Sequence, residues 1–418
     1  MRKPYTLDRL AFSDAVVLPA TPRFKETVAE DDTLFIHLGI TGKCYARCKG
    51  CINASFTKEN GKSREALVPF SDTIPDRDAR CILRLLERDG GTTATVCFYG
   101  GQPLLAVDKM GEVWNVLQRE CGSKKIRAMI YTNGELLPQA IERQPALIRD
   151  TWLFAVSIDG GDKQHDRVRL GTSLARIRSG LTSLAKVRTG QVLVWSTLRE
   201  EQSLWDCFEE FLSLFNSGLA DQFFWHWIEA DSPFIDFSGY LSRYGEELSR
   251  ILDIYLNWLA DGRIMPVTHL NELIIYLLTG RDRGSSACGV ELERNFDLVG
   301  GLVHACADLP QELAIGEVDP GGVPRLKGNS LRQLVQYKED LGCPACGIHP
   351  YCGGRCPVEA LAGNRERLSQ YCLLMRLHVG IVMERLEELT SLLERRGIRL
   401  QQLYDTSARF NRYTDVTP

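Results

Sequence analysis

The chain has 418 residues, 44% of them hydrophobic, which is enough for more than one domain with a buried core. Its 50 basic and 54 acidic residues give a formal net charge of -4 without long blocks of one sign, so the charge indicates neither a nucleic-acid partner nor a membrane partner. No apolar run is long enough for a signal peptide or a membrane-spanning helix, and we expect a cytoplasmic protein.

Fourteen cysteines are more than packing requires in a cytoplasmic chain, where disulfides are rare, so they indicate metal binding. Ten of the fourteen fall into patterned groups. The other four stand alone among apolar neighbours, and we interpret them as buried small hydrophobic residues. These four are Cys81, Cys97, Cys121 and Cys207.

After an N-terminal extension over residues 1–32, the segment 33–236 alternates short apolar runs with stretches of helical spacing. This alternation predicts an α/β fold in which helices connect parallel strands. We expect six strands in a closed or partly closed barrel. They are Leu34–Ile40, Thr95–Tyr99, Ala128–Tyr131, Leu153–Ile158, Val192–Thr197 and Phe223–Ile228.

A C-x3-C-x2-C motif, formed by Cys44, Cys48 and Cys51, follows the first predicted strand. Three thiolates in one short loop can hold three corners of a [4Fe–4S] cluster, which leaves the fourth iron without a protein ligand. An open metal position can bind a small molecule, as it does in catalytic zinc sites, so the motif indicates chemistry. A structural zinc site is the competing interpretation.

The motif and its position resemble those of the radical S-adenosylmethionine (SAM) superfamily. In that family the open iron binds the amino and carboxylate groups of SAM, and reduction of the sulfonium gives a 5′-deoxyadenosyl radical. The resemblance implies a partial (β/α)6 barrel with one [4Fe–4S] cluster and SAM as cofactors. The chain departs from the family at Gly50, before the third cysteine, where an aromatic residue is usual.

Two later strand ends carry small and polar residues that extend the resemblance. Gly100-Gly101-Gln102 looks like the family's GGEP motif, which contacts the SAM amino group, with Gln102 in place of Glu. An ordinary tight turn would also explain the two glycines. The third strand ends in Thr132 and Asn133, at the carboxyl edge where barrels bind their ligands.

The fourth strand runs into an S-I-D-G segment that is followed by His-Asp and Arg, which resembles the SPASM-containing branch of the superfamily. The resemblance implies that Ser157, Asp159 and Arg169 face the ribose and carboxylate of SAM. Each alone would also fit a helix cap, a turn or a surface ion pair. On the sixth strand, His226 and Glu229 are candidate catalytic residues, although a lone histidine is more often part of a barrel wall.

The rest of the chain divides into three segments. Residues 237–280 have apolar residues at three- and four-residue steps and predict a helical linker. Residues 281–372 are rich in Cys, Gly and Pro with little periodicity, as expected where metal centres replace a hydrophobic core. In the last segment, 373–418, we expect one amphipathic helix over Leu373–Arg396, ended by Gly397, and then a polar tail.

Seven cysteines between 288 and 372 form a second system that is similar to the SPASM domain. Structural zinc is the competing interpretation, because C-x2-C is common in zinc sites. The resemblance implies two auxiliary [4Fe–4S] clusters, and therefore three clusters in the chain. Cys343, Cys346, Cys352 and Cys372 would hold the outer cluster, and Cys288, Cys306 and Cys356 the inner one.

The inner set is one cysteine short of four, because sulfatase-maturating relatives carry an additional cysteine shortly before the position of Cys288. In this chain the residues at that place include Arg281 and Asp282. The fourth ligand would be Asp282, another group or a substrate thiolate, since thiolates are natural ligands of iron.

The resemblance covers nearly all of residues 34–372 and implies a radical SAM/SPASM enzyme that abstracts a hydrogen atom, with the cofactor carrying the difficult chemistry. Our leading hypothesis is maturation of a peptide or protein by a thioether or carbon–carbon crosslink, with flavodoxin or ferredoxin as the reducing partner. Only 43 residues precede Cys44, too few for a winged-helix leader-binding domain. Leader recognition would then need another surface or a separate protein.

Three alternatives stay open. An anaerobic sulfatase-maturating enzyme would oxidise Cys or Ser to formylglycine; Asp308 lies near where that group places its base, while the missing cysteine argues against it. A small-molecule enzyme could use the same scaffold. A non-catalytic iron–sulfur electron carrier would have every cluster fully ligated, which the three-cysteine loop argues against.

Overall fold

The computed structural model of the chain describes residues 16–51, 73–230, 232–309, 311–328, 330–362 and 364–408. All six predicted strands are present, and they pair in parallel and in chain order. The expected bounds are right to within a few residues. The strands are β1 (Leu34–Thr41), β3 (Thr93–Gly100), β4 (Lys125–Thr132), β5 (Leu153–Ser157), β7 (Gln191–Leu198) and β8 (Gln222–Trp227).

The sheet is open and continues into the cysteine-rich segment. Strand β9 (Asn295–Val299) pairs in parallel with β1, and β10 (Leu302–His304), β11 (Gly316–Val318) and β12 (Pro324–Leu326) follow in antiparallel pairing. The edge strands are β8 and β12, so the partly closed arrangement is confirmed and the closed barrel is not found. The sequence of the cysteine-rich segment has little periodicity, and its share in the main sheet was not predicted.

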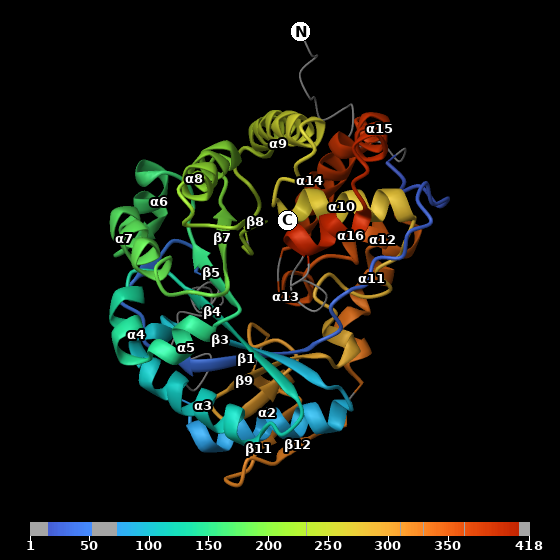
Figure 1. Cartoon of the computed structure of the whole chain (residues 1–418). Coiled ribbons are helices and arrows are strands. Elements are labelled where there is room, and N and C mark those ends of the chain that lie inside the picture. Colours follow the sequence, from blue (N-terminus) through green and yellow to red (C-terminus); the bar gives the residue numbers. More distant parts are fainter. Residues whose placement is uncertain are drawn as a thin grey trace.

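Helices cover the outer face of the sheet, on the left and lower side of Figure 1. Leu34, Ile36 and Leu38 of β1 belong to the large apolar core on this face, whereas Phe35 belongs to a smaller core on the inner face. This alternation is the two-residue period of a strand. The helices are α2 (Pro75–Asp89), α3 (Val107–Glu120), α4 (Leu137–Arg143), α5 (Pro145–Asp150), α6 (Asp162–Val168), α7 (Leu174–Leu184) and α8 (Leu204–Asn216).

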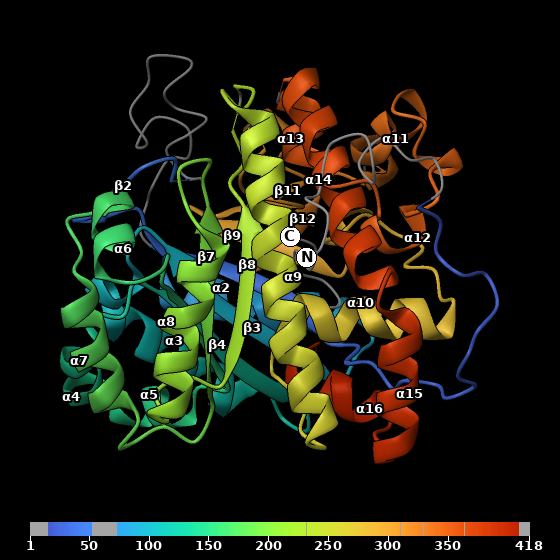
Figure 2. The ribbon, with the colours of Figure 1, turned by 90° about the horizontal axis from the view of Figure 1, so that it is seen from above.

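The predicted helical linker consists of α9 (Phe237–Ala260) and α10 (Thr268–Thr279). Helix α9 packs beside the edge strand β8 (Figure 2), and the ring centroids of Trp227 and Tyr244 lie 5.3 Å apart. No helix in the described ranges is long and apolar enough to cross a membrane.

The prediction of a single helix over Leu373–Arg396 is wrong in two respects, because the helix begins earlier and is interrupted. The structure has α14 (Arg365–Met383) and α15 (Leu386–Arg396). Helix α14 begins earlier because the Asn364 side chain accepts hydrogen bonds from two amides of its first turn. It is buried on several sides, so its apolar pattern did not mark its bounds. Gly397, with φ +63°, ends α15 as predicted.

Three of the four isolated cysteines, Cys81, Cys97 and Cys207, are fully buried, as predicted. The prediction is wrong for Cys121, which is partly exposed because it follows the last turn of α3 at the surface. The remaining short strands and α-helices are β2 (Arg47–Cys48), β6 (Arg169–Leu170), α11 (Tyr337–Asp340), α12 (His349–Cys352), α13 (Pro357–Ala362) and α16 (Leu400–Leu403).

Candidate active site

The first three patterned cysteines lie together in the loop after β1. Cys44, Cys48 and Cys51 are partly exposed and not engaged in disulfides, and the amide of Cys51 donates to the carbonyl of Cys48 at 3.3 Å. Three accessible thiols in one turn match what a cluster with one open iron requires. The donor set therefore fits a [4Fe–4S] cluster.

The two glycines at the end of β3 allow this loop to approach the sheet. A Cβ on Gly100 would lie 2.4 Å from the Thr41 carbonyl oxygen, and a Cβ on Gly101 would lie 2.1 Å from the Lys43 oxygen. The amide of Gly101 donates to the Thr41 oxygen at 2.8 Å. The two glycines were expected to allow a ligand to approach the backbone. In this structure they allow the backbone of the cysteine loop to approach the end of β3.

Four polar side chains meet beside that loop. The Thr132 hydroxyl donates to Gln102 Oε1 at 3.1 Å, and the Gln102 side-chain amide donates to Asn133. Asn133 Nδ2 in turn donates to the hydroxyl of Tyr45 at 2.9 Å. Tyr45 lies between Cys44 and Cys48 in sequence, so the structure brings the predicted residues Gln102, Thr132 and Asn133 together with the cysteine loop. Tyr45 was not predicted.

The loop is also paired with the segment that follows β5. Strands β2 and β6 form an antiparallel ladder in which Cys48 is opposite Arg169. Arg169 binds the Asp159 carboxylate through both ends of its guanidinium, at 2.7 Å and 3.1 Å. A bidentate pair of this kind fixes the direction of the arginine side chain. Ser157 shares the inner face of β5 with Leu153 and Ala155.

Arg199 is a second cation at this point, and sequence reasoning missed it. Its Nη1 lies 2.9 Å from Asp159 Oδ2, and its Nε donates to the Lys49 carbonyl in the cysteine loop at 2.8 Å. The side chain is 6% exposed. The only sequence signal was its place just beyond a strand end, which many surface arginines share.

Electrostatics keep the buried carboxylate of Asp159 charged. Asp159 is fully buried, and burial alone would raise its pKa, but Arg169 and Arg199 together hold the pKa well below its usual range. Burial lowers the pKa of the adjacent His165 to about 4. His165 is therefore neutral near pH 7, and its Nδ1 accepts the amide hydrogen of Asp159 at 3.1 Å.

The departure at Gly50 has a local structural basis. Gly50 has φ +55°, a conformation that favours glycine. A Cβ at this position would lie 2.3 Å from Cδ1 of Ile228, which follows β8. Ile228 thus occupies the space into which a larger residue 50 would project.

The family comparison identifies this part of the chain. Residues 38–197 match the model of the radical SAM superfamily, and they include the cysteine loop, both glycines and the Asp159–Arg169 pair. The chain contains a radical SAM domain.

Two of the solved structures that match this chain share its fold. Native anSMEcpe with bound AdoMet has a TM-score of 0.63 at 14% identity and covers 85% of this chain and 99% of that chain. Native anSMEcpe with bound AdoMet and Cp18Cys peptide has a TM-score of 0.62 at 14% identity, covering 86% and 99%. SuiB of Streptococcus suis bound to S-adenosylmethionine has a TM-score of 0.44 at 15% identity, covering 78% and 71%. A search of curated proteins found no match.

The candidate catalytic residues His226 and Glu229 lie at the end of β8, near the Asp159–Arg169 pair of the radical SAM domain. Thr197 connects them, because Arg169 Nη2 donates to its hydroxyl at 3.2 Å and His226 Nε2 lies 2.8 Å from the same oxygen. His226 Nδ1 is 3.7 Å from Glu229 Oε1. Burial would raise the pKa of Glu229, but the nearby His226 and Arg355 lower the pKa overall.

Asp308, the third candidate, lies toward the other end of the strand order, beyond β10. Its Oδ2 is 4.0 Å from the sulfur of Cys306. The neighbouring inner face also carries His37, whose Nδ1 lies 2.9 Å from Asp297 Oδ1, and Asp297 accepts the amide hydrogen of Ala307 at 2.6 Å. In the strand order, six other strands stand between β10 and β8, the strand that carries His226.

The second cysteine system divides into two groups. Burial and nearby groups that include Cys356 and Cys288 raise the pKa of Cys306, so these three are neighbours. Burial and the nearby Cys352, Cys343 and Cys346 raise the pKa of Cys372 to about 12, so these four are neighbours. The membership of the two groups is the one that the SPASM resemblance implies.

No three His, Cys, Asp or Glu side chains in the described parts of the chain are grouped as a single metal ion would require. A cubane cluster places each thiolate on a separate iron, so its ligands stand farther apart than those of one ion. Both groups of cysteines fit clusters by donor type, four thiols for the outer set and three for the inner set.

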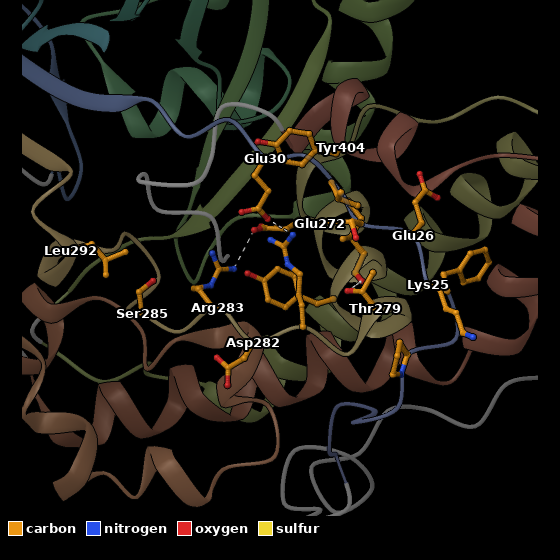
Figure 3. A pocket seen from close by; sticks show the side chains of 17 residues that line it. Lys25, Glu26, Glu30, Glu272, Thr279, Asp282, Arg283, Ser285, Leu292 and Tyr404 are labelled. Atoms are coloured by element: carbon orange, nitrogen blue, oxygen red, sulfur yellow. Dashed lines mark hydrogen bonds and ion pairs between the residues drawn. The ribbon is translucent and has the colours of Figure 1, made fainter. Parts of the chain in front are cut away.

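Asp282, one possible fourth ligand of the inner set, lies in a pocket of about 520 Å³ between residues 22–30 and α10. It is exposed, accepts the amide hydrogen of Gly284 at 2.7 Å, and points away from Arg283 (Figure 3). Arg283 pairs with the buried Glu272 at 3.2 Å. Asp308, which contacts Cys306, is therefore the better placed carboxylate.

Proposed function

We propose that this protein cleaves SAM reductively and abstracts a hydrogen atom from a peptide or protein substrate. The observation that carries the proposal is the contact of the three-cysteine loop with both halves of the candidate SAM site. On one side Gln102 donates its backbone amide hydrogen to the Lys43 oxygen at 2.9 Å, and on the other side Cys48 is paired with Arg169. A cofactor bound to an open iron would lie between these groups.

Cys44, Cys48 and Cys51 would hold the cluster. When bound, the cluster and SAM would supply the 5′-deoxyadenosyl radical by one-electron reduction of the sulfonium. Gln102 and Asn133 would bind the amino group of SAM, and Arg169 its carboxylate, while Ser157 and Thr132 would face the ribose side. Because both Asp159 oxygens already accept hydrogen bonds from arginines, Asp159 would position Arg169 and Arg199 without contacting SAM.

The substrate side would be the inner face of the sheet and the second cysteine system. We propose a peptide or protein that receives a thioether or carbon–carbon crosslink. The substrate would lose one hydrogen atom to the radical and one proton to a base, and an auxiliary cluster would accept the electron that is left. His226, Glu229 and Asp308 are the candidate bases, and flavodoxin or ferredoxin would deliver the initiating electron.

Formylglycine formation, as in anaerobic sulfatase-maturating enzymes, is the second candidate function. The observation that favours it is the position of Asp308 beside Cys306, 4.0 Å from its sulfur, because the reaction also needs a base near the substrate carbon that loses hydrogen. Both candidate functions begin with the reductive cleavage of SAM, and they differ in the modification that the substrate receives.

The test is anaerobic incubation of reconstituted protein with dithionite and SAM. The proposal predicts 5′-deoxyadenosine formation that is abolished by Cys48→Ala and retained by Cys81→Ala, since Cys81 is a buried residue of α2 outside the patterned cysteine groups. Protein that contains its clusters but forms no 5′-deoxyadenosine above background would instead support the non-catalytic electron carrier. Fragmentation mass spectrometry of candidate peptides then separates the two products. A crosslink loses two hydrogens and joins two residues, whereas formylglycine is confined to one residue, with loss of two hydrogens from serine or with a further exchange of sulfur for oxygen from cysteine.

A further inference from the structure

A pocket of about 520 Å³ lies between residues 22–30 and helix α10 (Figure 3). Its walls come from residues 22–30, from the stretch 272–292 and from Tyr404. None of these residues belongs to the cysteine loop or to the candidate SAM site. The volume is within the range of sites that bind small molecules, so this part of the fold has room for a ligand outside the candidate active site.

Glu272 of α10 supplies this pocket with an acceptor that has no donor. The residue is 5% exposed, and its Oε1 accepts a hydrogen bond from Nη2 of Arg283 at 3.2 Å (Figure 3). Among the described residues, none donates a hydrogen bond to its other oxygen, Oε2. A buried polar atom without a partner costs about 1–3 kcal/mol, and more when it is charged. A donor group on a ligand would remove this cost.

Both arginines of the pocket are already held by partners. Arg281 pairs with Glu30, and its guanidinium carbon lies 4.1 Å from the ring centre of Tyr276. Arg283 pairs with Glu272, and its guanidinium carbon lies 5.1 Å from the same ring centre. A guanidinium that contacts both a carboxylate and a ring is fixed in orientation. The arginines therefore form part of the wall, and Oε2 of Glu272 remains for a ligand.

The charges that line the pocket favour a cationic ligand. Four lining residues are acidic and three are basic, which leaves an excess of one negative charge. The acidic residues are Glu26, Glu30, Glu272 and Asp282, and the basic residues are Lys25, Arg281 and Arg283. Lys25 and Asp282 are both exposed, so water weakens their opposing effects. A charge-assisted hydrogen bond is about twice as strong as a neutral one, so a cationic donor satisfies the buried Oε2 of Glu272 best.

We propose that this pocket binds the cationic end of a lysine or arginine side chain of a peptide, with Oε2 of Glu272 as the acceptor. The inference rests on the proposed function in taking the ligand to be part of a peptide or protein substrate, which is anchored here away from the reacting atoms. Ser285 lines the pocket three residues before Cys288 of the inner group. A substrate anchored here would therefore begin beside the segment that leads to the second cysteine system.

The first experiment is a ligand-observed NMR titration of the full chain with small probes. Acetyl-arginine amide and acetyl-lysine amide carry the charge, and acetyl-citrulline amide is the neutral isostere of the arginine probe. We expect a charged probe to bind about tenfold more tightly than the citrulline probe. Equal affinities for the arginine and citrulline probes, or no binding of either charged probe, would overturn the inference. Binding of agmatine without binding of acetyl-arginine amide would identify a free cation as the ligand and overturn the assignment to a peptide.

The second experiment repeats the titration with variants of the pocket. Glu272→Gln removes the charge and keeps the size of the side chain, so it should weaken binding of the charged probe about tenfold. Thr27 lines the pocket and is exposed, so changing it leaves the core intact. Thr27→Lys should weaken binding and Thr27→Glu should strengthen it. Asp162→Asn is the control, since Asp162 is exposed on α6 and does not line the pocket, and it should leave the affinity unchanged.

Unchanged affinity in Glu272→Gln would show that the probe binds elsewhere and would overturn the inference. If Glu272→Gln does not fold, the two Thr27 variants decide, and equal affinities in both overturn the inference. Failure of the proposed function gives a different result, because the wild type would then bind the charged probe and form no 5′-deoxyadenosine. Failure of the inference alone leaves 5′-deoxyadenosine formation intact, and Glu272→Gln should form it at the wild-type rate when no substrate is present.

Discussion

Cys48 and Arg169 are opposite each other in the ladder between β2 and β6. The cysteine that would hold a cluster and the arginine that would bind SAM are therefore fixed by one pair of backbone strands. The guanidinium is then oriented by Asp159. Substitution of Asp159 should therefore disturb both the cysteine loop and the candidate SAM site.

We expect Asp159→Asn to lower the free energy of unfolding by about 3–5 kcal/mol, because it leaves two buried guanidiniums without their shared anion. It should also weaken SAM binding by the intact cluster. Anaerobic denaturant unfolding and SAM titration measure both effects. Asp162→Asn is the control: Asp162 is exposed and pairs with Arg178 at the surface, so less than about 1 kcal/mol should be lost. Equal effects of the two substitutions would refute this assignment.

Gly101→Ala tests the approach of the cysteine loop to β3. The new Cβ would lie 2.1 Å from a backbone oxygen of the loop, so the backbone must move, at a cost of about 1–3 kcal/mol. We expect lower iron content at the first site and less 5′-deoxyadenosine, with the second cysteine system intact. Gly321→Ala, where the nearest atom is 3.4 Å away, should change neither. Normal iron content in Gly101→Ala would show that the loop tolerates displacement.

Glu359 predicts a pH dependence of stability. Burial raises its pKa to about 8, against an ordinary value of 4.5. Between these values the folded state keeps a proton that the unfolded state releases, so stability falls as the pH rises toward 8, by up to about 1.4 kcal/mol per pH unit. A glutamine does not ionise, and its Oε1 can still accept the amide hydrogen of Ala230, as Glu359 does at 2.9 Å.

Glu359→Gln should therefore gain stability relative to the wild type as the pH rises from about 5.5 to about 8. The free energy of unfolding of the variant relative to the wild type is measured at the two pH values. Glu87 is exposed, so in the control Glu87→Gln this difference should stay constant. A difference that stays constant for Glu359→Gln as well would mean that Glu359 is ionised throughout this range.

Because the second cysteine system divides into two groups, we expect a substitution in one group to remove iron from that group alone. Cys343→Ala and Cys306→Ala should each remove up to about four irons per chain, and each should leave the EPR signal of the other auxiliary cluster in place. SAM cleavage by the first cluster should persist in both variants, with less product formed from substrate. Loss of both auxiliary signals in either variant would indicate a single shared centre.

Much of the fold could be predicted from the sequence because the buried parallel strands are continuous apolar runs. Strand β9 was missed, since it lies between cysteine-rich turns and has only five residues, too few to show a period. The bounds of α14 were missed because it is buried on several sides. A helix that packs against neighbours on several faces carries apolar residues around most of its circumference. It therefore lacks the amphipathic pattern from which the bounds of a helix are predicted.

The candidate site was predictable where residues are adjacent in sequence, as in the cysteine loop and the glycines. It was not predictable where the fold joins distant segments. Arg199 and Lys49 are 150 positions apart and meet only through the strand order. The burial of Arg355, which is 1% exposed, was not predicted either, because arginine side chains are seldom fully buried.

The central claim is that Cys44, Cys48 and Cys51 hold a cluster with one iron open to SAM. The most direct measurement is the EPR spectrum of the dithionite-reduced, reconstituted protein before and after SAM is added, with Cys81→Ala as the matched control. The account predicts a change in the signal of the first cluster in the wild type and in Cys81→Ala. A spectrum that contains the first-cluster signal and does not respond to SAM would contradict it.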